Sequence, residues 1–131
     1  MEKTITVGGI SFPARSSAAS FLAYKHNFNR DALRDMMNLV KGMPEGKNLD
    51  AIMAAIADND DFDLDIFFRF AWIFAKAADP KLPPLVTWLD GFDISPIDFL
   101  TECLEPVMDL LLSNIKTSVA AKNMQAAVSE K

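Results

Sequence analysis

Apolar and β-prone residues first gather at the beginning of the chain. Residues 3–13 contain two short β-prone runs that flank Gly8 and Gly9, and glycine tolerates the positive φ angles of a two-residue hairpin turn. Pro13 has no N–H to donate to a neighbouring strand, so it is expected to end the second run. The pattern predicts a β-hairpin over residues 1–13. Because an isolated hairpin is marginal in water, it should lie on helices or add to another sheet.

After the hairpin, apolar residues recur at helical spacing. Ser16 or Ser17 is suited to cap a short helix that ends near His26. Asn29 is suited to cap a second helix, which Gly42 would end. The expected apolar face of this second helix consists of Leu33, Met36, Met37 and Val40.

Three of the remaining predicted helices have a recognisable beginning. Asn48, after a loop at residues 43–47, is expected to cap a helix that carries Leu49, Ile52, Met53 and Ile56. A short helix should open at Pro83 and Pro84, because proline suits the first turn of a helix. Ser95 should cap the last long helix, and Pro106 is expected to kink or split it.

The segment at residues 63–78 is apolar almost all round, with a narrow polar stripe of Asp65, Arg69 and Lys76. Such a helix is either the centre of a core or one whose second face binds a partner. We predict the first, with four side chains largely buried: Phe67, Phe70, Ile73 and Phe74.

These elements predict a mainly α-helical, compact multi-helix domain with an N-terminal β-hairpin. Residues 1–115 should form this domain, and the length of 131 residues suits one domain. Residues 116–131 are rich in alanine and lack apolar periodicity, so they are expected to form a flexible or frayed C-terminal tail.

The charge of the chain is unevenly distributed, although its net charge is only −5. Residues 51–115 hold three Lys or Arg against twelve Asp or Glu, a charge of −9, whereas residues 1–50 and 116–131 each carry +2. An acidic middle argues against a nucleic-acid or anionic membrane partner, because phosphates require a basic surface. It favours a protein partner with a basic stretch.

The apolar segments and the cysteine content suggest the compartment. Residues 66–78 come closest to a membrane span, but Arg69 and Lys76 interrupt them. A signal-peptide pattern is absent from the first residues. The single cysteine, Cys103, cannot form an internal disulfide, as is typical of a reducing cytosol. A cytoplasmic protein is therefore expected.

The candidate chemistry is sparse. His26 is the only histidine, and Cys103 lies between Leu100 and Leu104, where a free cysteine is usually buried. An acidic run, which lacks the glycine and the last glutamate of an EF-hand, is better explained by helix capping, although adventitious cation binding stays open. Its members are Asp58, Asp60, Asp61, Asp63 and Asp65. We expect no enzyme activity, no cofactor and no metal.

The apolar content needs an explanation, because the chain holds ten Phe, two Trp and seven Met. One interpretation is a rich core, and the other is a groove for an apolar partner helix, since methionine adapts to irregular surfaces. The candidate groove residues are Phe62, Phe68, Trp88 and Phe92. Asp60, Asp61 and Asp63 are the candidates for steering a basic flank of the partner.

Three stretches of the chain carry a resemblance to a known family. They are the hairpin at residues 4–12, Phe-Ala-Trp-Ile-Phe-Ala-Lys-Ala-Ala-Asp at residues 70–79, and Leu-Val-Thr-Trp-Leu-Asp-Gly-Phe at residues 85–92. Their order resembles the tail assembly chaperones of long-tailed bacteriophages, especially those of Gram-positive hosts, over about residues 4–115. The Pro83–Pro84 step and the alanine-rich tail are not part of the resemblance.

The resemblance implies a non-catalytic, helical protein of the host cytoplasm that is absent from the virion. Such a protein binds the tape measure protein, keeps it soluble and supports polymerisation of the tail tube protein around it. Many members also exist in a longer, frameshifted form. Two alternatives stay open: a structural or adaptor subunit of a particle, and a small enzyme with a site at an oligomer interface. A homo-oligomer is compatible with each of them.

Overall fold

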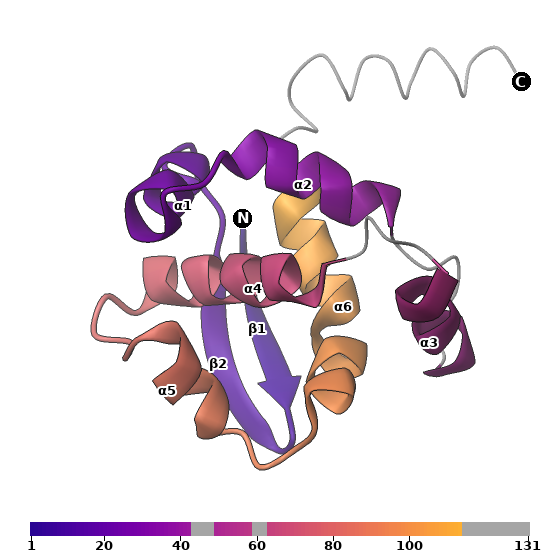
Figure 1. Ribbon diagram of the computed structural model, residues 1–131. Helices are drawn as coiled ribbons and strands as arrows, with labels where there is room; N and C mark the ends of the chain where they lie inside the picture. Colours follow the sequence, from indigo (N-terminus) through magenta and orange to yellow (C-terminus); the bar gives the residue numbers. More distant parts are fainter. Residues whose placement is uncertain (43–48, 59–62, 114–131) are drawn as a thin grey trace, which may run out of the picture.

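A computed structural model describes residues 1–42, 49–58 and 63–113 of the chain (Figure 1). The described residues form a two-stranded antiparallel hairpin and six helices, which confirms the predicted mainly α fold with an N-terminal hairpin. The elements are β1 (Glu2–Val7), β2 (Ile10–Arg15), α1 (Ser20–Phe28), α2 (Ala32–Lys41), α3 (Leu49–Asp58), α4 (Leu64–Ala78), α5 (Leu85–Asp90) and α6 (Pro96–Ser113). The predicted loop at residues 43–47, the cap Asn48 and the tail at residues 116–131 lie outside the described residues.

The hairpin turns at the two predicted glycines. Gly8 and Gly9 have φ angles of 56° and 80°, the positive values that a two-residue primed turn requires. The prediction that Pro13 ends the second strand is wrong, because β2 continues to Arg15 and Pro13 stands opposite Thr4. Hydrogen-bonded pairs alternate along an antiparallel ladder, and Ser16 N donates to Met1 O at its open end. Pro13 therefore falls at a position whose missing N–H would point away from β1.

One face of the hairpin packs on helices, as expected for so small a sheet. The inward side chains Ile5, Val7, Phe12 and Ala14 are buried. α4 contacts β2 and α6 contacts β1, so the hairpin forms one layer and these helices form the other (Figure 1).

α4 is the central helix, as predicted. The exposed fractions of Phe67, Phe70, Ile73 and Phe74 are between 0% and 2%. α4 contacts α1, α2, α5 and α6 as well as β2, so nearly every direction around it is occupied. Asp63 caps the helix by accepting a hydrogen bond from Asp65 N at 2.9 Å.

The first two helices begin later than predicted. α1 starts at Ser20, where Ser17 N donates to Ser20 Oγ, and it extends to Phe28. Asn29 is not the cap of α2: it adopts a left-handed conformation, with φ of 53°, at the end of α1. Asp31 caps α2 instead and accepts a hydrogen bond from Arg34 N.

α5 and α6 complete the body. The N–H of the Trp72 ring donates to Pro83 O at 2.9 Å and so fixes the start of α5 against α4. Ser95 Oγ caps α6 through Asp98 N, as predicted. Pro106 does not split α6, which is continuous from Pro96 to Ser113.

Candidate functional site

The predicted groove residues that the structure describes are covered to different degrees, and Phe68 and Phe92 line a small hollow of about 100 Å³. Trp88 and Phe92 are buried in a cluster of edge-to-face rings with Phe12 of the hairpin and Phe99 of α6, at centroid distances of 5.1–5.8 Å. Phe68 is half-buried beside Phe99. Phe62 lies outside the described residues. A partner would find little of Trp88 and Phe92 to contact, because the hairpin and α6 already cover them.

Of the predicted steering acids, the structure describes only Asp63. Asp63 serves as the cap of α4, and Asp60 and Asp61 lie outside the described residues. Acidic side chains instead follow one face of α6 at positions 98, 102, 105 and 109. Two of them bind the hairpin, Glu102 by accepting a hydrogen bond from Gly8 N and Asp109 through an ion pair of 3.1 Å with Lys3.

Of the eight large apolar side chains that are exposed among the described residues, four lie on α1 and α2. Three on α2 are spaced by four and three residues and therefore share one side of that helix. A hollow of about 390 Å³ between the two helices is lined by Phe21, Leu22 and Leu33, among others. We define the α1–α2 surface as Leu22, Leu33, Met37 and Val40, whose exposed fractions are 60%, 50%, 60% and 41%.

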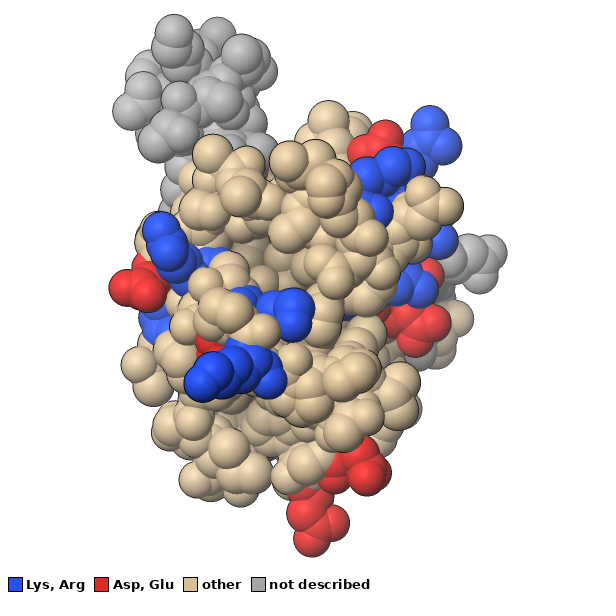
Figure 2. Space-filling view, turned by 90° about the vertical axis from the view of Figure 1, so that its left-hand side faces the viewer, with Lys and Arg blue, Asp and Glu red and all other residues tan. Residues whose placement is uncertain are grey.

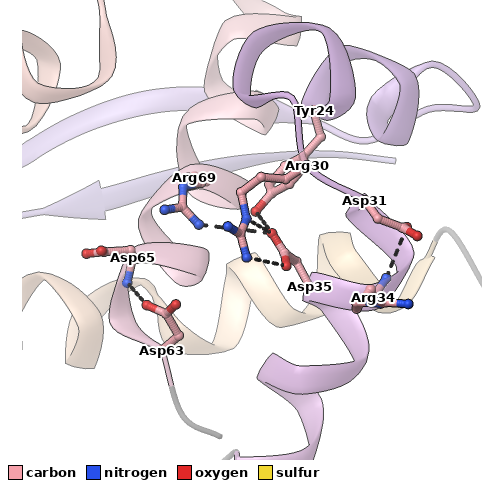
Figure 3. A network of polar contacts seen from close by, with 8 residues as sticks. All are labelled: Tyr24, Arg30, Asp31, Arg34, Asp35, Asp63, Asp65 and Arg69. Carbon is pink, nitrogen blue, oxygen red and sulfur yellow. Dashed lines mark hydrogen bonds and ion pairs between the residues drawn. The ribbon is translucent and has the colours of Figure 1, made fainter.

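A buried polar network holds α2 in this orientation (Figure 3). The carboxylate of Asp35, whose exposed fraction is 2%, lies on the inward side of α2. Arg30 donates to both of its oxygens, at 2.6 Å and 2.9 Å, and the hydroxyl of Tyr24 donates at 2.7 Å. The network therefore joins α1, the α1–α2 connection and α2.

The network keeps Asp35 ionised despite its burial. Burial alone would raise the pKa of Asp35, but the hydrogen bonds from Arg30 and Tyr24 outweigh it and hold the pKa below its usual value. Burial, and then Asp35, raise the pKa of Tyr24 well above its usual value, so the phenol stays a donor. Arg69 of α4 adds a second positive charge, with Nη1 4.0 Å from Asp35. This nitrogen is buried and makes no hydrogen bond to the part of the chain that the structure describes.

The network explains why the predicted apolar face of α2 is only partly right: Met36 is buried, but Leu33, Met37 and Val40 are exposed. The face that packs inward consists of Ala32, Asp35, Met36 and Leu39. The carboxylate of Asp35 lies on this inward side, whereas the predicted face included Leu33, Met37 and Val40. Because Arg30 and Tyr24 satisfy Asp35, the helix instead turns three apolar side chains outward. Arg30, five residues before Asp35, was the signal in the sequence that would have revealed this.

The charge around the α1–α2 surface is mainly positive. Exposed Lys25, Arg34 and Lys41 lie on α1 and α2. Figure 2 views the side of the molecule where α1 and the C-terminal end of α4 lie: Lys and Arg form two groups there, and Asp and Glu lie beside both groups and at the lower edge. The surface is therefore suited to an apolar partner with acidic flanks, whereas a basic flank would be attracted to α6.

Other sites offer less chemistry. A hollow of about 480 Å³ between α1 and the end of α4 is lined by Arg15, Asn27 and Lys76, among others, and Lys76 already donates to Pro80 O and lies over the Trp72 ring. Burial, and to a smaller degree Glu102, raise the pKa of Cys103 to about 12. Within residues 1–42, 49–58 and 63–113, no group of three or more His, Cys, Asp or Glu side chains could hold a metal ion.

In the described part of the chain, every helix is too short or too polar to cross a membrane. No protein-family model matches the chain, and comparisons with curated proteins and with solved structures gave no match.

Proposed function

We propose that this chain is a non-catalytic chaperone that holds an apolar helix of another protein on its α1–α2 surface. In the proposed setting, the partner is the tape measure protein of a long-tailed bacteriophage. The chain keeps that protein soluble in the host cytoplasm while the tail tube protein polymerises around it.

The observation that carries the proposal is the outward row of Leu33, Met37 and Val40 on α2, continued by Leu22 on α1. An amphipathic helix binds such a row through its own apolar side chains at positions i, i+4 and i+7. Methionine in the centre of the row tolerates partners of different shape, as a holdase requires. The exposed cations beside the row would attract acidic residues that flank the apolar face of the partner.

The resemblance to tail assembly chaperones supports the identity of the partner, and the surface supports the mode of binding. The two lines of support are independent, because the residues of the resemblance lie in and around the hairpin, α4 and α5, whereas the row lies on α2.

Co-expression with a tape measure protein tests the proposal. We expect this chain to raise the soluble fraction of that protein severalfold. A variant with Leu33→Ser, Met37→Gln and Val40→Ser should lose the effect, since it removes the apolar row. The matched control is Val86→Ser, which changes a side chain with an exposed fraction of 78% on α5. Circular dichroism should show that both variants are folded.

Two results would contradict the proposal. If the triple variant solubilises the tape measure protein as well as the original chain does, the α1–α2 surface is not the binding site. If the chain is retained in purified virions, it is a structural or adaptor subunit rather than a chaperone.

A further inference from the structure

The hollow between α1 and the end of α4 combines hydrogen-bond donors with small apolar side chains, on the side of the molecule viewed in Figure 2. Its volume of about 480 Å³ is in the usual range of ligand pockets. The polar lining consists of Arg15, Ser17, Ser20, Asn27 and Lys76, and the apolar lining consists of Ala19, Ala23, Ile73, Ala77 and Pro80. None of these described lining residues is acidic, so the hollow offers positive charge without a carboxylate of its own.

The two cations of the hollow retain the capacity to bind an anion. Arg15 makes no ion pair in the part of the chain that the structure describes, although Glu2 stands opposite it in the hairpin. Lys76 donates to two carbonyl oxygens, those of Pro80 and Leu82, at 3.2 Å and 3.5 Å. Neither acceptor is charged, and an ammonium group has three N–H bonds, so Lys76 can donate a further hydrogen bond to a ligand.

The uncharged polar groups of the hollow are also arranged as donors. The hydroxyl oxygens of Ser17 and Ser20 accept hydrogen bonds from Ala19 N and Ser17 N, at 3.2 Å and 2.9 Å, which leaves both O–H groups to donate. Asn27 uses one N–H of its side-chain amide for Ala23 O and keeps the other. The N-terminal end of α1 adds partial positive charge, and its first turn holds no acidic residue to neutralise it.

We propose that this hollow binds the C-terminal carboxylate of a peptide whose last residue is apolar. In such a residue the carboxylate and the side chain leave the same carbon atom, so the first can meet the donors while the second meets the alanines and Ile73. A peptide is favoured over a free acid because the hollow opens to solvent, which gives the rest of the peptide chain a way out. The exposed lining residues are Arg15, Ala19, Asn27, Ala77 and Pro80.

The proposed site is separate from the α1–α2 surface, so the inference does not rest on the proposed function. Ala19, Ala23 and Asn27 are spaced by four residues and share one side of α1, whereas Leu22 and Lys25 line the hollow beside α2. The triple variant of the α2 row should therefore bind the peptide as the original chain does. If it loses the peptide, the peptide binds on the row and the inference is overturned.

Calorimetric titration with an N-acetylated tetrapeptide, three alanines followed by leucine, tests the inference. We expect saturable binding of the free acid. The C-terminal amide should bind about tenfold more weakly, because it lacks the charge-assisted hydrogen bonds of the carboxylate. Arg15→Gln should weaken binding of the acid by about threefold or more. The matched control is Lys25→Gln, which removes the same charge from another side of α1 and should leave the affinity nearly unchanged. Circular dichroism should show that both variants are folded.

Three further results would overturn the inference. Equal affinity for the acid and the amide would show that the carboxylate is not recognised. No saturable binding of the acid below about 10 mM, or equal losses in the Arg15 and Lys25 variants, would show that the hollow is not the site. Isocaproate carries the carboxylate and the side chain of leucine without a peptide. If it binds as tightly as the tetrapeptide, the hollow takes small carboxylates and the assignment to a peptide is wrong.

Discussion

α4 and α2 both carry many apolar side chains, yet the sequence predicts their surroundings with very different success. α4 is apolar almost all round and contacts most of the other elements, so any rotation about its axis buries large side chains. α2 has two apolar sides, and only one of them packs inward. Its rotation is decided by Asp35, a single carboxylate that Arg30 and Tyr24 make acceptable in the interior.

The difference shows how a protein can hold an apolar surface in water. Turning Leu33, Met37 and Val40 inward would expose Met36 and Leu39 in exchange, so hydrophobic burial alone distinguishes only weakly between the two orientations. The Asp35 network opposes that rotation, because an ionised carboxylate on the inward side needs the three donated hydrogen bonds that this orientation provides. The exposed row on α2 is thus a consequence of polar chemistry within the core.

The largest expected effect is on the free energy of unfolding, which a substitution in α4 should lower far more than a substitution in α2. Phe70→Ala in α4 should lower the free energy of unfolding by about 3–5 kcal/mol, because it leaves a cavity around a side chain that is 1% exposed. Leu33→Ala in α2 should change it by less than about 0.5 kcal/mol, as is usual at an exposed position. Urea denaturation followed by circular dichroism measures both. Similar losses for the two variants would show that Leu33 is buried and the comparison false.

Removal of the buried carboxylate should have the next largest effect. Asp35→Ala leaves the hydroxyl of Tyr24 without its acceptor and two guanidinium groups without their counter-ion, which should cost about 3 kcal/mol. The matched control on the same helix is Asp31→Ala, which removes an exposed cap and should cost about 1 kcal/mol. If both variants lose the same free energy of unfolding in urea, the network does not hold α2.

Much of the fold could be predicted from sequence, because local signals specify it. Glycines mark the hairpin turn, Asp63 and Ser95 mark the beginnings of helices, and the apolar pattern identifies α4. The continuation of β2 through Pro13 was missed because it depends on hydrogen-bond register, which only the paired strands reveal.

The candidate site was harder to predict, because burial depends on which elements meet. Trp88 and Phe92 flank an acidic break and a Pro-Pro turn in sequence, but Phe12, about 80 residues away along the chain, covers them. The α2 row depends on the pairing of Arg30, Tyr24 and Asp35, a contact between side chains of different elements. Periodicity within one helix carries no information about such a pair.

A smaller expected effect is the dependence of the free energy of unfolding on pH. Because the pKa of Asp35 is lowered on folding, its charge stabilises the protein at any pH above about 3.9, the usual pKa of an unfolded aspartate. That stabilisation is lost as the pH falls through the lower pKa of the folded state. The difference in free energy of unfolding between the original chain and Asp35→Asn should therefore be largest near pH 7 and shrink below about pH 4. A difference that is constant from pH 7 to pH 2 would show that the charge of Asp35 does not matter.

The orientation of α2 is tested most directly by thiol labelling of neighbouring positions in the native protein. Met37 and Met36 are adjacent, with exposed fractions of 60% and 5%, and the native Cys103 is fully buried. Met37→Cys should react as fast as Val86→Cys, which is exposed on α5. Met36→Cys should react at least about 100-fold more slowly, because its labelling requires opening of the core. If Met36→Cys reacts as fast as Met37→Cys, or faster, then α2 is rotated, the row is not exposed and the proposed binding surface does not exist.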